Sequence, residues 1–244
     1  TRHGNHAELV SSALAAGKNV FVEKPLAINQ QQLDQVRAAL DASNNENGAP
    51  QLMIGFNRRF SSLIKDIKQA LNSVQNPIAM VMTVNAGYIP GNHWTQSKDE
   101  GGGRLIGEAC HFIDLLRFLA GHAITTSSAQ LMQSECSDTA TINLTFANGT
   151  IGTVHYFSNG HKDISKERLE VYADGKVIQM DNFRSLKATG WKNLKSRKLS
   201  KQDKGHAEEI RQFIAGLVNG QPAPIPLDEL IEVSQHSLNI SPWS

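Results

Sequence analysis

The sequence has few cysteines, no long apolar run and almost no net charge. Cys110 and Cys136 are its only cysteines, which rules out a disulfide framework and favours a reducing compartment. No apolar run approaches the roughly 20 residues that span a bilayer. The 24 basic and 23 acidic residues leave a formal charge of +1, without the basic excess typical of proteins that bind nucleic acids or membrane surfaces. These absences favour a soluble cytoplasmic protein that binds neither nucleic acid nor membrane.

Sites that depend on regular spacing of reactive side chains are also missing. The two cysteines lie 26 residues apart and the histidines are dispersed, so no zinc-like spacing occurs and we expect no metal. Neither a nucleophile elbow nor a P-loop is present. A late basic run contains a single aromatic residue, Trp191, so a solvated loop is favoured over an anion or nucleic-acid site. That run comprises Lys187, Lys192, Lys195, Arg197, Lys198, Lys201 and Lys204.

Hydrophobic residues make up 40% of the chain, enough for an ordinary core, and their spacing changes along it. The first part predicts helices near 5–17 and 29–40, strands at 19–22 and 51–56, and a polar loop at 43–50. Asn5 is expected to cap the first helix, and Asn29 with Gln32 resembles a capping box for the second. This alternation of helix and strand is typical of a doubly wound parallel sheet.

Beyond Arg59 the pattern indicates strands joined by tight turns. Helices are expected near 61–72, 105–119 and 210–218, and strands at 78–84, 142–146, 150–157, 169–172 and 176–180. Asn148-Gly149 and Asp174-Gly175 are two-residue turns typical of hairpins. The second part is therefore predicted to be an α+β domain built on an antiparallel sheet.

Glu23-Lys24-Pro25 directly follows the first buried strand. Ligands of open α/β sheets bind at the carboxyl ends of strands, so a charged pair there is well placed for function. A lysine in a dry cleft can polarise a hydroxyl or transfer a proton. A solvated charge pair at a strand end explains the same residues equally well.

Three glycines, Gly101 to Gly103, precede a helix that carries Glu108, His111 and Asp114. Consecutive glycines allow close backbone approach to a ligand, and a helix N-terminus favours negative charge. The three polar residues are three positions apart and share roughly one helix face. Histidine is the usual acid or base near neutral pH, although a lone helical histidine more often caps a carbonyl or packs in the core.

Together these motifs resemble the Gfo/Idh/MocA family of NAD(P)-dependent oxidoreductases, which act on sugars, nucleotide sugars and inositols. The matching segments, in order, are Ala16-Gly17-Lys18-Asn19-Val20-Phe21-Val22-Glu23-Lys24-Pro25, Gly55-Phe56-Asn57-Arg58-Arg59-Phe60 and the glycine triplet through Asp114. The resemblance implies the carboxyl-terminal half of a Rossmann domain, with a truncated parallel sheet, over residues 1–56. It also implies a substrate-binding and oligomerisation domain with an open-faced antiparallel sheet over residues 57–244.

The resemblance also implies residue roles. Lys24 would contact the reacting hydroxyl or carbonyl and the nicotinamide ribose, and His111 would move the hydroxyl proton. The nicotinamide end of NAD or NADP would be lined by Thr1, His3, His6, Glu23, Lys24 and Pro25. A sugar-like substrate would be bound by Asn57, Arg58, Tyr88, His93, Trp94, Glu108 and Asp114.

Two departures from the family pattern bear on these roles. The family commonly has an aspartate four residues before its catalytic histidine, where this chain has Gly107, and Glu108 lies about 100° further around a helix. The family's G-x-G-x-x-G turn, which binds the pyrophosphate, does not occur in the sequence. We therefore expect a fragment, with Thr1 falling just after the fourth strand of the nucleotide domain.

Three functions remain compatible with the sequence. The first is an NAD(P)-dependent dehydrogenase acting by hydride transfer, incomplete as this chain. The second is a non-catalytic binding or oligomerisation module, which would form homo-oligomers through its sheet and could not bind cofactor alone. The third is a glycosidase that uses a bound nicotinamide.

Overall fold

The computed structural model describes residues 1–43, 49–134 and 136–243, which form two compact units. The first unit comprises residues 1–56, 91–110 and 209–244, and the second comprises 57–90 and 111–208. One boundary between the units lies between Phe56 and Asn57. Two later segments, 91–110 and 209–244, belong to the first unit.

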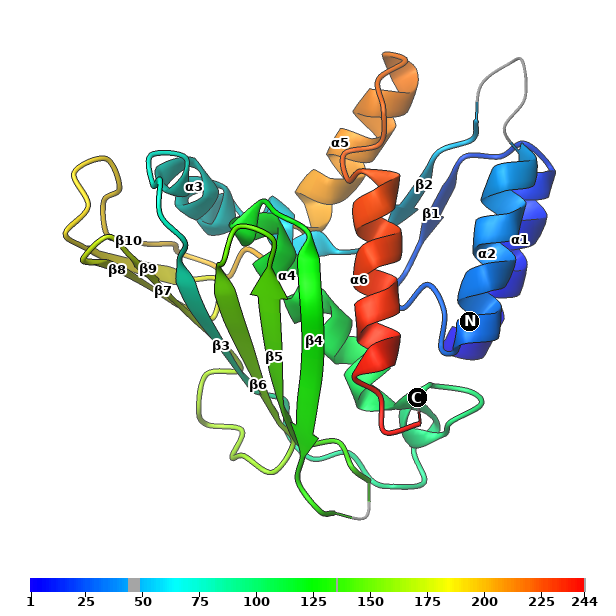
Figure 1. Ribbon diagram of the computed structural model, residues 1–244, viewed down its shortest axis with the longest axis horizontal. Helices are drawn as coiled ribbons and strands as arrows, with labels where there is room; N and C mark the ends of the chain where they lie inside the picture. Colours follow the sequence, from blue (N-terminus) through cyan, green and yellow to red (C-terminus); the bar gives the residue numbers. More distant parts are fainter. Residues whose placement is uncertain (44–48, 135, 244) are drawn as a thin grey trace. The chain divides into compact units, whose positions relative to one another are not determined.

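The first unit holds a short parallel sheet. Strand β1 (Val20–Val22) pairs in parallel with β2 (Leu52–Ile54). Its helices are α1 (His6–Ala15), α2 (Gln30–Ser43), most of α5 (His206–Val218) and α6 (Leu227–Asn239), with short 3-10 turns at His3–Asn5 and Trp94–Gln96. Helix α6 packs against α2 and β2 (Figure 1), where Gln235 hydrogen-bonds with Gln30 and Arg37.

The second unit is an eight-stranded sheet in the order β10-β9-β8-β7-β3-β6-β5-β4. The strands are β3 (Ala79–Asn85), β4 (Ile124–Leu131), β5 (Ala140–Phe146), β6 (Ile151–Phe157), β7 (Glu167–Ala173), β8 (Lys176–Asp181), β9 (Ser185–Thr189) and β10 (Arg197–Lys198). All neighbours are antiparallel except β3 and β6. A 3-10 turn (Asn57–Phe60), α3 (Ser62–Leu71) and α4 (Cys110–Ala120) complete the unit.

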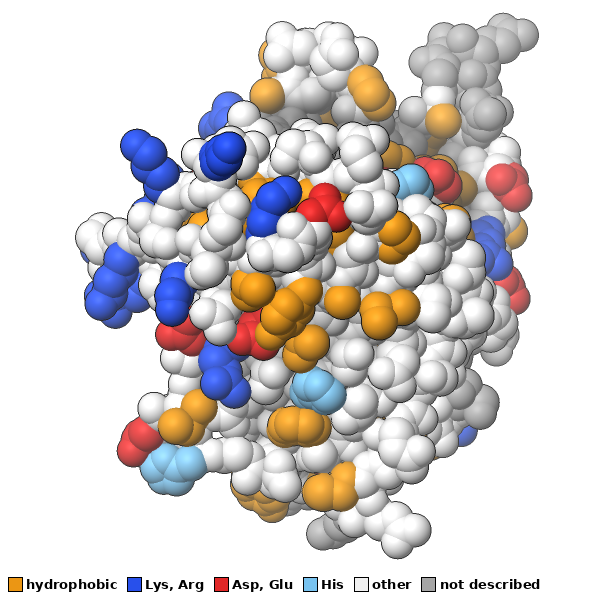
Figure 2. Space-filling view, turned by 60° about the vertical axis from the view of Figure 1, so that its left-hand side comes forward, with side chains coloured by type: hydrophobic (Ala, Val, Ile, Leu, Met, Phe, Trp, Pro, Cys, Tyr) orange, Lys and Arg blue, Asp and Glu red, His pale blue; other side chains and the backbone are white. Residues whose placement is uncertain are grey.

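One face of this sheet is buried and the other is open. Met80, Met82 and Val84 of β3 are inward and buried, and a Cβ on Gly152 of β6 would lie 2.9 Å from Leu116 of α4. The opposite residues are more exposed, and Figure 2 shows apolar side chains gathered on that face. The short parallel sheet and the large, mostly antiparallel sheet with one exposed face confirm the predicted fold class.

The helix caps predicted from short-range sequence patterns are present in part. The predicted capping residue Asn29 accepts from the backbone N–H of Gln32 at 2.9 Å, and Gln32 accepts from the N–H of Ile28 at 3.0 Å. Asn5, by contrast, makes no side-chain cap, because a 3-10 turn leads directly into α1. The predicted loop at 43–50 lies partly outside the described residues.

Candidate active site

Lys24 lies at the carboxyl end of β1, as the sequence predicts for a functional residue of an α/β sheet. Its half-buried side chain donates from Nζ to the backbone carbonyl oxygen of Gly107 at 2.6 Å. The Lys24–Pro25 peptide bond is cis. An ion-to-carbonyl hydrogen bond of this length holds the ammonium in one place, so Lys24 is not a freely solvated charge.

Gly107 belongs to a π-helical turn, Leu105–Ala109, that leads into α4. Such turns are rare and concentrate at functional sites. A Cβ on Gly107 would lie 2.9 Å from Cε1 and 3.2 Å from Nδ1 of His3. The missing side chain therefore makes room for an imidazole, and residue 107 offers Lys24 a backbone oxygen instead of a carboxylate.

His3 and His6 both face this part of the first unit. His3 Nδ1 lies 2.8 Å from the carbonyl oxygen of Gly101, and His6 Nδ1 lies 2.8 Å from that of Pro25. Since a carbonyl only accepts, the hydrogen-bonded nitrogen of each ring carries the proton. Burial lowers the pKa of His3 to about 4 against the opposing effect of its Gly101 hydrogen bond, and the nearby positive charges of Lys24 and His6 add to this. His3 is therefore neutral at pH 7.

The lowered pKa of His3 predicts a loss of stability in acid. The folded chain takes up the His3 proton near pH 4, whereas an unfolded histidine takes it up near 6.5, so unfolding binds a proton between these values. The stabilisation is fully present above pH 6.5 and disappears as the pH falls to about 4. We expect the melting temperature of the chain to fall more across this window than that of His3→Asn. Parallel curves for the two proteins would contradict the neutral assignment.

The glycine triplet packs against the chain itself. A Cβ on Gly101 would overlap the backbone of Thr95, one on Gly102 would overlap Ile28, and one on Gly103 would overlap the ring of Trp243. Gly102 and Gly103 also have φ values of +71° and +73°, which favour glycine. The close approach expected for a ligand is thus made to neighbouring residues, and the triplet fixes the entry to the π-helical turn.

In the second unit, Arg58 forms a buried ion cluster. Its guanidinium bonds Glu167 at 3.0 and 3.4 Å, and Lys204 Nζ donates to the same carboxylate at 2.8 Å. Burial alone would raise the pKa of Glu167, but the charges of Arg58 and Lys204 outweigh it and hold that pKa below its usual value. Arg58, expected to bind substrate, is thus ion-paired with Glu167.

Asp114 also forms a buried ion pair, with Arg59. Both of its carboxylate oxygens accept from Arg59, with Nε to Oδ2 at 3.0 Å. Asn57 is buried, donates to the carbonyl of Lys204 at 2.8 Å and lies 3.1 Å from His206 Nε2. The side chains of Arg58, Asp114 and Asn57 therefore bind other residues of the second unit. His111 is buried at the start of α4, three residues before Asp114.

The other expected site residues are dispersed. Trp94 packs edge-on against His3, with ring centroids 4.7 Å apart, whereas His93 hydrogen-bonds Thr95. Glu108 pairs with Arg104 at 3.3 Å. Thr1, Glu23 and Tyr88 are exposed, Tyr88 by 77%. His3, His6, Lys24, Pro25 and Trp94 come together in the first unit.

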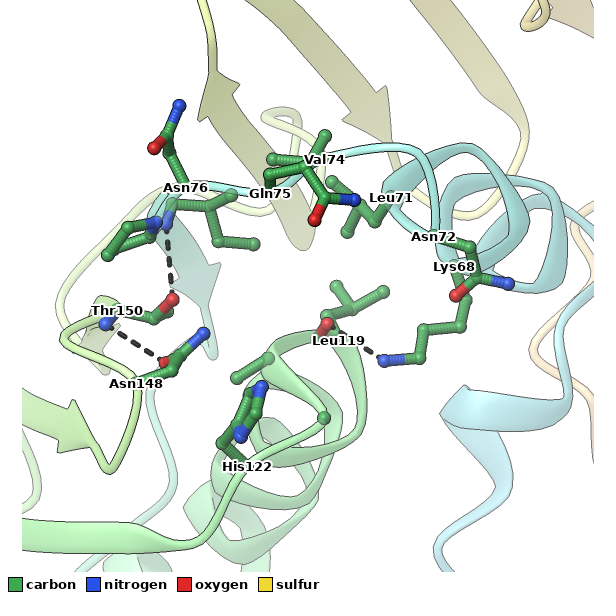
Figure 3. A pocket seen from close by; sticks show the side chains of 14 residues that line it. Lys68, Leu71, Asn72, Val74, Gln75, Asn76, Leu119, His122, Asn148 and Thr150 are labelled. Carbon is green, nitrogen blue, oxygen red and sulfur yellow. Dashed lines mark hydrogen bonds between the residues drawn. The ribbon is translucent and has the colours of Figure 1, made fainter.

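A separate cavity of about 400 Å³ lies in the second unit, at the carboxyl ends of α3 and α4 (Figure 3). Lys68, Asn72, His122 and Asn148 line it, and Lys68 donates to the Leu119 carbonyl at 3.1 Å. None of the expected site residues contributes to this cavity. In the described part of the chain, no three His, Cys, Asp or Glu side chains cluster to hold a metal, and no helix is long and apolar enough to cross a membrane.

The sequence did not predict the partners of Arg58 and Lys24, which are Glu167 and the Gly107 carbonyl. Glu167 carries a usable signal, because it precedes the predicted strand at 169–172 and alternates with Leu169 and Val171, whose side of the strand is buried, so its carboxylate requires a cation. The Gly107 carbonyl carries none, since no side-chain pattern marks a π-helical turn.

Comparison with known proteins decides the family. Residues 1–47 match the model described as "Oxidoreductase family, NAD-binding Rossmann fold", and residues 76–179 match the GFO/IDH/MocA C-terminal domain, together more than half of the chain. The chain belongs to the Gfo/Idh/MocA family. The expected relation to nicotinamide-dependent oxidoreductases is thereby confirmed.

Three similar proteins illustrate the range of this family. Myo-inositol 2-dehydrogenase of Thermotoga maritima is 25% identical over 90% of this chain and 68% of its own length. The uncharacterized oxidoreductase YrbE of Bacillus subtilis is 28% identical over 73% of this chain and 53% of its own length. The structure of UDP-N-acetylglucosamine 3-dehydrogenase GnnA from Acidithiobacillus ferrooxidans aligns with a TM-score of 0.77, 18% identity and coverage of 99% and 75%. This last likeness shows the shared fold.

Proposed function

We propose that this chain carries the residues that bind and activate substrate in an NAD(P)-dependent oxidation of a hydroxyl on a sugar, nucleotide sugar or inositol-like polyol. The observation that carries the proposal is the ammonium of Lys24, held on the Gly107 carbonyl at the carboxyl end of β1. Two relatives named for inositol and UDP-N-acetylglucosamine support the substrate class. The chain spans only 53% of the Bacillus relative, so this activity is a proposal for the protein as a whole.

In this reaction Lys24 binds the substrate oxygen. A positive charge beside a hydroxyl stabilises the alkoxide character that develops as the carbon–hydrogen bond breaks. His111 accepts the hydroxyl proton, the usual task of an imidazole near neutral pH. A nicotinamide cofactor, when bound, would supply the hydride acceptor. Lys24 is hydrogen-bonded to Gly107, four positions before His111 in the chain.

The first unit fits the nicotinamide end of such a cofactor. The ammonium of Lys24 and the neutral imidazole of His3 lie near the carboxyl end of a parallel strand, where they can hydrogen-bond with the ribose hydroxyls and the carboxamide of the cofactor. Thr1, Glu23 and Pro25 belong to the same segments of the proposed cofactor site. The sequence has no G-x-G-x-x-G turn for a pyrophosphate, so the proposal concerns the nicotinamide end alone.

A titration with NADH and NADPH, followed by fluorescence, tests cofactor binding by the chain. Micromolar binding that is weakened in Lys24→Ala supports the enzyme. Absence of binding to either cofactor favours the second candidate function, a non-catalytic module whose role is assembly.

The open face of the large sheet supports assembly in either case. Ile151 and Tyr172 flank Ala79 across adjacent strands, and the two are 55% and 42% exposed. We propose that this face, which carries the apolar side chains gathered in Figure 2, forms a contact between copies of the chain.

A charge placed on this face should weaken the contact. We expect Ile151→Asp to raise the dissociation constant of the oligomer about tenfold or more, since the carboxylate must lose its water in the interface. Light scattering across a dilution series measures this. Ile164→Asp is the matched control, because Ile164 is 57% exposed but lies outside the strands. Equal behaviour of the two variants would exclude the sheet face.

A further inference from the structure

We infer that His3 and Gly107 form a coupled pair that positions Lys24. The imidazole of His3 occupies the space that a side chain at residue 107 would fill, and this leaves the Gly107 carbonyl to bind the Lys24 ammonium. His3 is thus a positioning residue that acts through Gly107. The inference rests on the proposed function only in treating Lys24 as the residue that binds substrate.

Two hydrogen bonds and one close approach connect these residues, all within the first unit. His3 Nδ1 donates to the Gly101 carbonyl at 2.8 Å, which fixes the ring against the glycine triplet. The ring lies where a Cβ on Gly107 would come within 2.9 Å of it. The Gly107 carbonyl in turn accepts from Lys24 Nζ at 2.6 Å. A displacement of the ring or of the π-helical turn therefore moves the acceptor of Lys24.

The ring of His3 is also held from its other sides. Trp94 contacts it edge-on, and the guanidinium of Arg2 lies 4.7 Å from the centre of the Trp94 ring. His6 is its other aromatic neighbour, with centroids 5.6 Å apart. Because the ring is packed on these sides, it cannot simply rotate away from a side chain added at residue 107. The displacement is passed instead to the segment that carries Trp94.

The charge state of His3 is consistent with this role. Lys24 and His6 face the ring, and Arg2 approaches it through Trp94. A protonated imidazole would add a second cation beside Lys24, whereas the neutral ring does not repel the ammonium. The pKa of about 4 keeps His3 neutral throughout the physiological range.

A double-mutant cycle tests the coupling. In Gly107→Ala the new Cβ displaces the His3 ring, and we expect acylation of Lys24 by a soluble amine reagent to become about tenfold faster, as for loss of a hydrogen bond to a charged group. In the His3→Ala background the same change at residue 107 should alter the rate less than about twofold, because the Cβ then has room. Peptide mass spectrometry measures each rate, with exposed Lys18 as the internal control.

His3→Asn separates space filling from hydrogen bonding. The asparagine amide can donate to the Gly101 carbonyl as Nδ1–H does, but it is smaller than an imidazole. Lys24 should stay protected in this variant, and it should tolerate alanine at residue 107. In the wild-type chain, nitrogen NMR should show the proton of His3 on Nδ1 and a titration midpoint near 4, moving towards 6.5 in Gly107→Ala.

The outcomes separate this inference from the proposed function, since neither readout needs turnover. An equal effect of Gly107→Ala in both backgrounds, or no effect on Lys24 in the wild-type background, would overturn the coupling. If Gly107→Ala does not fold, recovery of folding in the double variant supports the coupling and failure of both overturns it. Coupling without any oxidoreductase activity would count against the proposed function alone.

Discussion

Replacing Lys24 by alanine is expected to lower kcat for polyol oxidation by about a hundredfold or more. The ammonium supplies the positive charge beside the substrate oxygen, and positioned acid–base groups of this kind contribute roughly 10²–10⁴-fold. The loss should appear mainly in kcat, because the charge matters most when the oxygen becomes anionic. Reduction of NAD or NADP in the presence of a panel of inositols and sugars measures it.

Two further variants sharpen this prediction. Lys18→Ala removes an exposed lysine from the same segment and should leave kcat within about twofold. Lys24→Arg keeps the charge, but a planar guanidinium cannot reproduce the single 2.6 Å bond to the Gly107 carbonyl, so activity should remain low. Wild-type turnover in Lys24→Ala would remove Lys24 from the mechanism.

Glu167→Gln is expected to cause the largest loss of stability. The carboxylate is fully buried and forms ion pairs with both Arg58 and Lys204 in the second unit. Removing one partner of a buried ion pair leaves an uncompensated charge and typically costs about 3–5 kcal/mol. We expect a loss of this size in the free energy of unfolding, measured by urea denaturation.

Glu170→Gln is the matched control on the same strand. Glu170 lies on the open side of β7, where it accepts from Tyr172 and Gln179, so its loss should cost less than about 1 kcal/mol. Because the pKa of Glu167 is lowered, its stabilisation is present at neutral pH and disappears as the pH falls through the folded-state pKa. The variant should lack this acid-dependent loss. Equal costs for the two variants would show that the cluster contributes little.

The sequence predicted those features that depend on neighbouring residues. The hairpin at Asn148-Gly149 forms with Gly149 at a φ of +84°, although its turn spans residues 147–150 and not two residues alone. The Asn29 cap is also present, and both features are decided within a few residues. Strands β4, β9 and β10 and helix α6 were not predicted. Of these, β4 pairs along its length with β5, the next strand in the chain, and this pairing compensates for its weak apolar alternation.

The candidate site was predictable as a set of segments but not as a set of contacts. Lys24 follows from its place after a strand, whereas its bond to Gly107 depends on a π-helical turn 83 residues away. Asp114 shares a predicted helix face with His111, yet its carboxylate is taken by Arg59. Which of several polar residues pairs internally depends on long-range packing, which the spacing within one helix does not show.

Transfer of deuterium from carbon tests the central claim most directly. The chain would be incubated with NAD or NADP and with inositols and sugars fully deuterated at carbon, and the reduced cofactor analysed by mass spectrometry. We expect one deuterium in the reduced nicotinamide, and a large loss of this product in Lys24→Ala. Binding of NADH without any deuterated cofactor from these polyols would contradict it.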